Sequence, residues 1–215
     1  MSTNIMAKKV VDFNNSNDIA QLYDDIKTVQ GMEHFVVPIH KAINILQDYK
    51  EENTLSTEQI RKIYDNLKIN EHMTPEEMNR SMDASINQNT RIAVIEKKFL
   101  QATINRTEFS AMIESIMNHF NTVISGPILT AIKQIIDNFS CICLMARNQF
   151  SFQDVCFKFF TRDKNNEILV LVLNIQYDQT SFVYKFLNLC KFKKLKIHLN
   201  FFGTIVKTDF PQLNF

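Results

Sequence analysis

The chain has 215 residues, of which 45% are hydrophobic and 22% are charged, and its formal net charge is +1. This size and composition are typical of one folded domain with a substantial core, and they exclude wholesale disorder. The near-neutral charge excludes a protein that binds nucleic acid through a strongly basic surface, so we expect no nucleic-acid partner.

The N-terminal half is predicted to be mostly helical. Residues 1–16 are polar and predict a flexible N-terminal arm, followed by a single α/β domain over residues 17–215. Pro38 is expected to start a helix with an apolar face, and Ser56 starts another because Ser56 and Gln59 form a capping box. The short polar loop between these two helices predicts a helical hairpin.

Two further segments precede the middle of the chain. Thr74 and Glu77 form a second capping box, and the helix after them carries Met78 and Met82 on a weak apolar stripe. Residues 91–100 fit the period of a strand as well as that of a helix, so periodicity leaves both open. The run Glu-Lys-Lys in this segment consists of good helix formers and favours a helix.

Two helices with apolar faces are predicted next. The first follows Thr107, a candidate N-cap, and its apolar residues recur at helical spacing as far as Ile124. Gly126 and Pro127 end this helix and start the second one, because glycine tolerates positive φ and proline suits the first helical position. The apolar stripe of the second helix reaches Phe139.

The period then changes to two, which predicts a β-hairpin. Its strands cover residues 152–162 and 167–177, and the turn between them is rich in Asp and Asn. Residues 168–173 are an unbroken aliphatic run, so we expect the second strand to be buried on both faces of a sheet. Such a strand requires three layers, and the two preceding helices are the candidates for one outer layer.

The C-terminal region is predicted to add strands, although residues 182–192 fit both a helix and a strand. After them apolar residues alternate with polar ones, namely Leu195, Ile197, Leu199 and Phe201 with Lys194, Lys196, His198 and Asn200. This alternation predicts a strand that lies near a sheet edge and has one solvent-exposed face. Residues 205–210 are predicted to form a last strand that ends at Pro211.

The sequence lacks the patterns of the common catalytic and cofactor sites. Its three glycines lie far apart, which excludes the glycine-rich loops of nucleotide sites. Neither the zinc-protease pattern H-E-x-x-H nor the serine motif G-x-S-x-G occurs, and the four cysteines lack zinc-site spacing. We therefore expect a non-enzymatic protein without catalytic residues, cofactors or a metal. No secretory signal or transmembrane helix is expected, which predicts synthesis in the cytoplasm.

Four lysines gather near the C-terminus, namely Lys191, Lys193, Lys194 and Lys196, and apolar residues lie between them. One interpretation is attraction to an anionic membrane, which gains about 1 kcal/mol for each lysine near the head groups. The other interpretation is a solvated strand face whose charges deter edge-to-edge pairing.

The order of these elements resembles the Cyt-type cytolytic δ-endotoxins and the related volvatoxin-like pore-forming proteins. The segments that carry the resemblance are MIESI at 112–116, VIS at 123–125, IIDNF at 135–139, VCFKFFT at 155–161, ILVLVLNIQ at 168–176 and LNFFGTI at 199–205. The resemblance implies an α/β (α+β) fold in which helical hairpins wrap a mainly antiparallel sheet. The N-terminal half is then rich in helices and the C-terminal part is rich in strands.

The resemblance also implies a cytolytic protein that is stored in intracellular inclusions and acts at the membrane of a target cell. Its partners are then a phospholipid membrane and further copies of the chain, which form a homo-oligomer and insert β-strands. The residues implied to contact the membrane are Phe157, Phe159, Leu169, Leu171, Leu173, Ile197, Leu199, Phe201, Lys191, Lys193, Lys194 and Lys196. The strand over residues 167–177 is long enough to take part, because a tilted strand needs about 9–11 residues to cross a bilayer.

A second interpretation comes from a different functional class. It is a non-enzymatic structural or interaction protein, viral or intracellular, that uses its helices for self-assembly or partner binding. Met73, Met78, Met82 and the apolar stripe over residues 109–124 are its candidate contact surface. The same stripes are also typical of a buried core.

Overall fold

The computed structural model describes residues 8–53, 55–70, 72–86, 92–145, 154–163, 165, 167–182 and 192–208. These residues contain six helices and one five-stranded sheet, so the fold is mixed α/β. The helices are α1 (Ser16–Lys27), α2 (Glu33–Asn53), α3 (Thr57–Leu67), α4 (Pro75–Ile86), α5 (Arg106–His119) and α6 (Gly126–Met145). The strands are β1 (Lys8–Asp12), β2 (Ile92–Asn105), β3 (Asp154–Arg162), β4 (Glu167–Phe182) and β5 (Phe192–Thr208).

The sheet has the strand order β1-β3-β4-β5-β2, which places β4 at its centre. Only β1 and β3 pair in parallel, whereas β3–β4, β4–β5 and β5–β2 are antiparallel. The sheet is therefore mainly antiparallel, as predicted. Its longest members are β4 with 16 residues and β5 with 17 residues.

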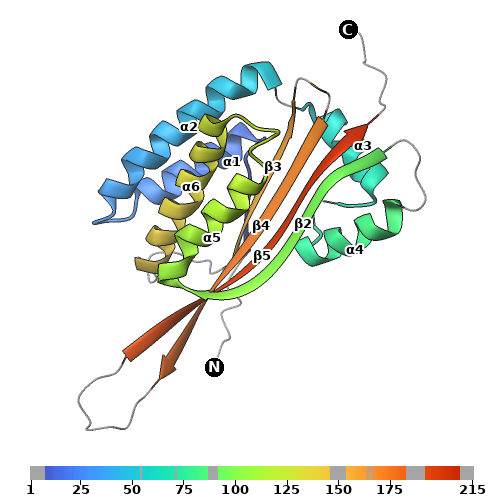
Figure 1. Ribbon diagram of the computed structural model, residues 1–215. Coiled ribbons are helices and arrows are strands. Elements are labelled where there is room, and N and C mark those ends of the chain that lie inside the picture. The colour runs from blue at the N-terminus through green and yellow to red at the C-terminus, as the bar shows by residue number, and fades with distance from the viewer. Residues whose placement is uncertain are drawn as a thin grey trace.

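Helices cover the two faces of the sheet unequally, as Figure 1 shows. Helices α1, α2, α5 and α6 pack on one face, which we call the covered face, and share one apolar core with it. Helices α3 and α4 pack on the other face and form a second core with part of it. We call this second face the half-open face, because its polar part lies outside that core.

The aliphatic run in β4 confirms the prediction of a strand buried on both faces. Leu169 and Leu171 belong to the core of the covered face, while Ile168 and Val170 belong to the second core. All four side chains are at most 4% exposed. The three-layer architecture follows from this run, because both sides of β4 need an apolar cover.

The flexible-arm prediction for residues 1–16 is wrong for the part that the structure describes. Residues Lys8–Asp12 form β1 and pair with β3. Phe13 is only 2% exposed and stacks on Phe157, with 5.6 Å between the ring centroids. A polar-looking segment is ordered here because a neighbouring strand satisfies its backbone groups, which local composition does not reveal. Residues 1–7 lie outside the described residues.

Several helix predictions need correction. Helix α2 begins at Glu33 and continues through Pro38, although this proline removes one intrahelical hydrogen bond. Helices α2 and α3 do not form the predicted hairpin, because the chain passes between them to the other face of the sheet. Asn105, rather than Thr107, occupies the N-cap of α5, and this helix ends at His119 instead of reaching Ile124.

The strand predictions also need correction. The helix predicted over residues 91–100 is wrong for residues 92–100, which belong to β2 and pair with β5, and residue 91 lies outside the described residues. β5 runs without a break to Thr208, so residues 205–210 are not a separate strand. β4 continues past Tyr177 to Phe182. The ambiguous residues 183–191, together with residues 209–211, lie outside the described residues.

Candidate functional site

The apolar residues predicted to contact a membrane lie together on one face of the sheet. All eight belong to the core of the covered face. Each is at most 5% exposed: Phe157, Phe159, Leu169, Leu171, Leu173, Ile197, Leu199 and Phe201. We call these eight residues the apolar stripe. Helices α1, α2, α5 and α6 cover the stripe, so in this conformation a membrane cannot reach it.

The predicted lysines do not join the apolar stripe in the described structure. Lys196 is half-buried, and its register partners in the neighbouring strands are Asn105 and Asp178. Lys193 and Lys194 belong to β5, but their side chains lie outside the described part of the molecule, as does the whole of Lys191. The anionic-surface interpretation of the four lysines therefore stays a prediction.

The β4–β5 hairpin is longer than the sheet that flanks it. The pairing of β3 with β4 stops at Gln176, and the pairing of β2 with β5 stops at Lys196. Beyond this point β4 and β5 pair only with each other among the described residues, from Gln179 opposite Leu195 to Phe182 opposite Phe192. Figure 1 shows this ribbon, which we call the projecting hairpin, extending away from the helices.

The half-open face changes character along β4. Val170 and Val172 are buried beneath α3 and α4, whereas Asn174 is half-buried and Gln176 is exposed. β5 and then β2 continue this polar region on one side of β4. Six polar side chains from three adjacent strands form it, and we call them the open-sheet patch: Gln101, Thr103, Asn174, Gln176, His198 and Asn200.

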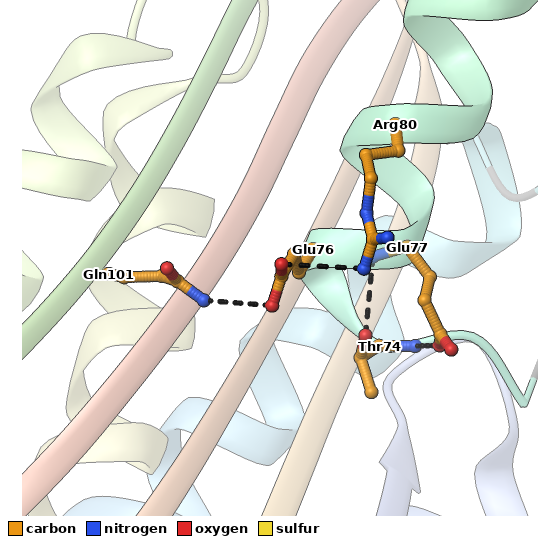
Figure 2. A network of polar contacts seen from close by, with 5 residues as sticks. All are labelled: Thr74, Glu76, Glu77, Arg80 and Gln101. Atoms are coloured by element: carbon orange, nitrogen blue, oxygen red, sulfur yellow. Dashed lines mark hydrogen bonds and ion pairs between the residues drawn. The ribbon is translucent and has the colours of Figure 1, made fainter.

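Hydrogen bonds hold the outer edge of the open-sheet patch. Thr103 Oγ1 lies 3.0 Å from His198 Nδ1, which joins β2 to β5. Gln101 Nε2 donates to Glu76 Oε2 on α4 at 3.3 Å, and Arg80 contacts the other oxygen of the same carboxylate, as Figure 2 shows. The first turn of α4 is thereby tied to the edge of the sheet.

Both predicted capping boxes are present. In front of α4, Thr74 donates its backbone N–H to the Glu77 carboxylate at 2.7 Å, and the Glu77 N–H donates to Thr74 Oγ1 at 3.2 Å (Figure 2). In front of α3, Ser56 and Gln59 make the equivalent pair of bonds. These boxes satisfy N–H groups that a helix start otherwise leaves without partners.

A buried hydrogen bond ties β4 to the helical layer near the base of the projecting hairpin. The Tyr177 hydroxyl donates to Ser140 Oγ on α6 at 2.6 Å. Ser140 is fully buried and Tyr177 is 6% exposed. Burial raises the pKa of the Tyr177 hydroxyl well above its usual value, so it remains a proton donor.

Two of the three methionines and most of the helical stripe proposed as a contact surface are core residues, whereas Met73 is half-buried beside the second core. Met78 and Met82 are fully buried against the half-open face. The stripe of α5 packs against the covered face, where Ile113 and Ile116 are at most 1% exposed. For Met78, Met82 and the α5 stripe the interaction-surface interpretation is therefore wrong, and the alternative of a buried core is confirmed.

No group of three or more His, Cys, Asp or Glu that could hold a metal ion occurs among the described residues. Within the same residues, no helix combines the length and the apolar character needed to cross a membrane. Cys141 and Cys143 are free thiols. Burial raises the pKa of the Cys143 thiol, which keeps it protonated.

Sequence reasoning did not find the open-sheet patch as a unit. The alternation of Lys196, His198 and Asn200 correctly indicated a wet face on β5. A further signal was present in Asn174 and Gln176, which interrupt the apolar character of β4. The contribution of β2 could not be seen, because this segment was predicted to be a helix.

The comparisons with known proteins give the following result. No family model and no curated protein matches the sequence. Two solved structures are similar in the path of their chains. One is the activated Cyt2Ba monomer from Bacillus thuringiensis subsp. israelensis, with 12% identity over 72% of this chain and 93% of that chain and a TM-score of 0.40. The other is a delta-endotoxin, with 13% identity over 73% of this chain and 81% of that chain and a TM-score of 0.37.

Proposed function

We propose that this protein is a membrane-active pore former that inserts its β4–β5 hairpin into a phospholipid bilayer. The observation that carries the proposal is the opposite chemistry of the two sides of this hairpin in the part that carries the open-sheet patch. Leu173 and Leu199 lie on the apolar side, whereas Gln176, His198 and Asn200 lie on the polar side. Strands that span membranes alternate in this way, with apolar residues toward lipid and polar residues toward a water-filled interior.

The length of the hairpin supports the same proposal. β4 has 16 residues and β5 has 17, and a tilted strand needs about 9–11 residues to cross the hydrocarbon core. The projecting hairpin lies beyond the helical layers, so part of this length is accessible without any change in the fold. We propose that this end makes the first contact with the bilayer.

Insertion requires that α1, α2, α5 and α6 separate from the covered face, because they bury the apolar stripe. Lipid chains can replace the apolar contacts that the helices lose, so the stripe does not have to be transferred into water. The outer edges of the inserted strands need hydrogen-bond partners, since lipid offers none. The proposal therefore includes a homo-oligomer in which neighbouring copies pair these edges.

Dye release from phospholipid vesicles tests pore formation. Vesicles of phosphatidylcholine and phosphatidylserine are loaded with a small dye and, separately, with a large dextran. We expect release of the small dye that rises with protein concentration while the dextran is retained, because a pore of fixed width discriminates by size. Absence of release over the range in which the protein binds these vesicles would refute the proposal.

A single-tryptophan pair tests which side of the hairpin faces lipid, and the chain contains no tryptophan that would interfere. Phe201→Trp places the probe in the apolar stripe on β5, and His198→Trp places it on the polar side of the same strand. With vesicles of brominated phosphatidylcholine we expect quenching of the first probe and little quenching of the second. Equal quenching of both probes would contradict the proposed orientation. Both variants are first compared with the unchanged chain by circular dichroism.

One observation favours the second candidate function, a protein that self-assembles without lysis. β2 is a 14-residue strand at the edge of the sheet, and Ile95 is 50% exposed where its pairing with β5 shifts. An exposed edge is a template for pairing with another chain. Concentration-dependent oligomers in sedimentation experiments, together with absence of dye release, would support this function instead of the pore former.

A further inference from the structure

The open-sheet patch is a regular grid of hydrogen-bonding side chains. Gln101, Asn200 and Asn174 are direct register partners across β2, β5 and β4, and they form one row. The second row, two residues along each strand, consists of Thr103, His198 and Gln176. Neighbouring strands lie about 4.8 Å apart, so six polar groups point from a rigid surface at spacings of a few ångströms.

The grid lines a shallow cleft of about 400 Å³, to which Ala102 and Leu199 also contribute. This volume falls in the range of sites for small ligands. No Asp, Glu, Lys or Arg lines the cleft. A phosphate or an ammonium group would need an opposite charge to offset its desolvation, so the lining favours an uncharged ligand.

Two atoms in the cleft have hydrogen-bonding capacity that the described residues do not fill. The Oδ1 atoms of Asn174 and Asn200 are shielded from solvent and have no hydrogen-bond partner. Nearly all buried polar atoms in proteins have a partner, and those that lack one call for an explanation. The two residues are register partners in β4 and β5 and both line the cleft, so one ligand can contact both side chains.

The side chains of the grid combine donors and acceptors. An amide group donates through its NH₂ and accepts through its oxygen, and the imidazole and hydroxyl of the other two residues have both capacities. A ligand hydroxyl also donates and accepts at the same atom. Several hydroxyls on a rigid ring therefore match a grid of amides better than a ligand that only donates or only accepts.

We propose that the open-sheet patch binds a neutral, hydroxyl-rich ligand, namely a sugar. The ligand is either a free saccharide or the head group of a glycolipid, and both present the same chemistry to the cleft. The glycolipid form deepens the proposed function and rests on it, because it would hold the projecting hairpin close to the bilayer. The patch borders that hairpin, since His198 lies two residues before the end of the β2–β5 pairing at Lys196.

Nuclear magnetic resonance of the full chain tests the free-saccharide form. Lactose, N-acetylglucosamine and methyl α-mannoside are each added up to about 50 mM, a range that covers weak millimolar affinity. We expect saturable shifts of the Asn174 and Asn200 side-chain amides with at least one sugar. Inorganic phosphate is the charged control and should leave these signals in place. Saturable shifts of the patch signals with phosphate would overturn the inference of a neutral ligand.

The glycolipid form is tested by co-sedimentation with phosphatidylcholine vesicles that contain or lack galactosylceramide. Stronger binding to the glycolipid vesicles without a response to free sugars identifies the head group as the source. A response to free sugars alone identifies a soluble saccharide. If neither sugar nor glycolipid has an effect, the proposal is refuted. Dye release from vesicles without sugar tests pore formation separately, so the two proposals can fail independently.

The double variant Asn174→Leu/Asn200→Leu removes the central hydrogen-bonding groups while keeping side chains of similar size. We expect the fold to persist, because each change removes a shielded oxygen that has no hydrogen-bond partner among the described residues. Sugar affinity should fall at least about tenfold, as expected for the loss of two hydrogen bonds. Lys207→Ala, at an exposed position near the other end of β5, is the matched control. Unchanged affinity in the folded double variant would overturn the proposal.

Discussion

Gly203 in β5 lies against Phe120, the residue that follows α5. A Cβ atom at this position would lie 2.5 Å from Phe120 Cζ and 2.6 Å from Phe201 Cζ. Real Cβ contacts are almost never shorter than 3.0 Å, so both rings must shift. Both phenylalanines are fully buried, and their ring centroids lie 5.9 Å apart. We therefore predict that Gly203→Ala destabilises the fold by forcing Phe120 away from the sheet.

The expected loss is about 1–3 kcal/mol, the usual effect of adding a methyl group to a well-packed core. For a chain of this size each kcal/mol lowers the melting temperature by roughly 2–4 °C, so a loss of about 2 kcal/mol corresponds to roughly 4–8 °C. Thermal and urea unfolding followed by circular dichroism measure both quantities. Gly126→Ala is the matched control, since a Cβ there meets no atom within 4 Å. Its stability should stay within about 0.5 kcal/mol of the unchanged chain.

A double-mutant cycle with Phe120→Leu shows whether the loss comes from this contact. A smaller side chain at position 120 makes room for the new methyl group, so Gly203→Ala should be less damaging in the Phe120→Leu background. Equal damage in both backgrounds, or wild-type stability of Gly203→Ala, would refute the reasoning. Under the proposed function the loosened cover should also increase dye release per bound molecule.

Three further variants test the packing of the sheet. Leu171→Asp should abolish folding, because it buries an unpaired charge on the central strand, whereas Ile95→Asp at a half-exposed edge should remain folded. Circular dichroism and gel filtration distinguish the two outcomes. A stable, monomeric Leu171→Asp variant would contradict the three-layer architecture. Ser140→Ala should lower the free energy of unfolding by about 1–3 kcal/mol, because it leaves the buried Tyr177 hydroxyl without its partner. The decrease, measured by urea unfolding, should be smaller in a Tyr177→Phe background. Equal decreases in both backgrounds would refute the coupling of these two residues. Burial raises the pKa of Asp137, so the folded state favours its protonated form, and stability is lost as the pH rises through the pKa of the unfolded and then of the folded state. Asp137→Asn should therefore raise the melting temperature at pH 7 and change it little near pH 3. A larger increase at pH 3 than at pH 7 would refute this explanation.

The sequence by itself determined the features that rest on local chemistry or on a very strong pattern. The capping boxes at Ser56 and Thr74 were predictable because a cap and its partner are three residues apart in the chain. The central strand was predictable because residues 168–173 are aliphatic on both sides, and only a strand between two covering layers buries both. The wet face of β5 was predictable from the alternation around Ile197.

The tertiary structure decided everything that depends on which distant segments meet. Residues 92–100 include good helix formers, yet they form part of β2 because pairing with β5 satisfies their backbone groups on both sides of the bulge at Ile95. Residues 8–12 look like a polar arm, yet pairing with β3 makes them a strand. The open-sheet patch exists only once Gln101, Asn200 and Asn174 become register partners. Their separations along the chain are large, and periodicity within one segment carries no information about the segment that lies beside it.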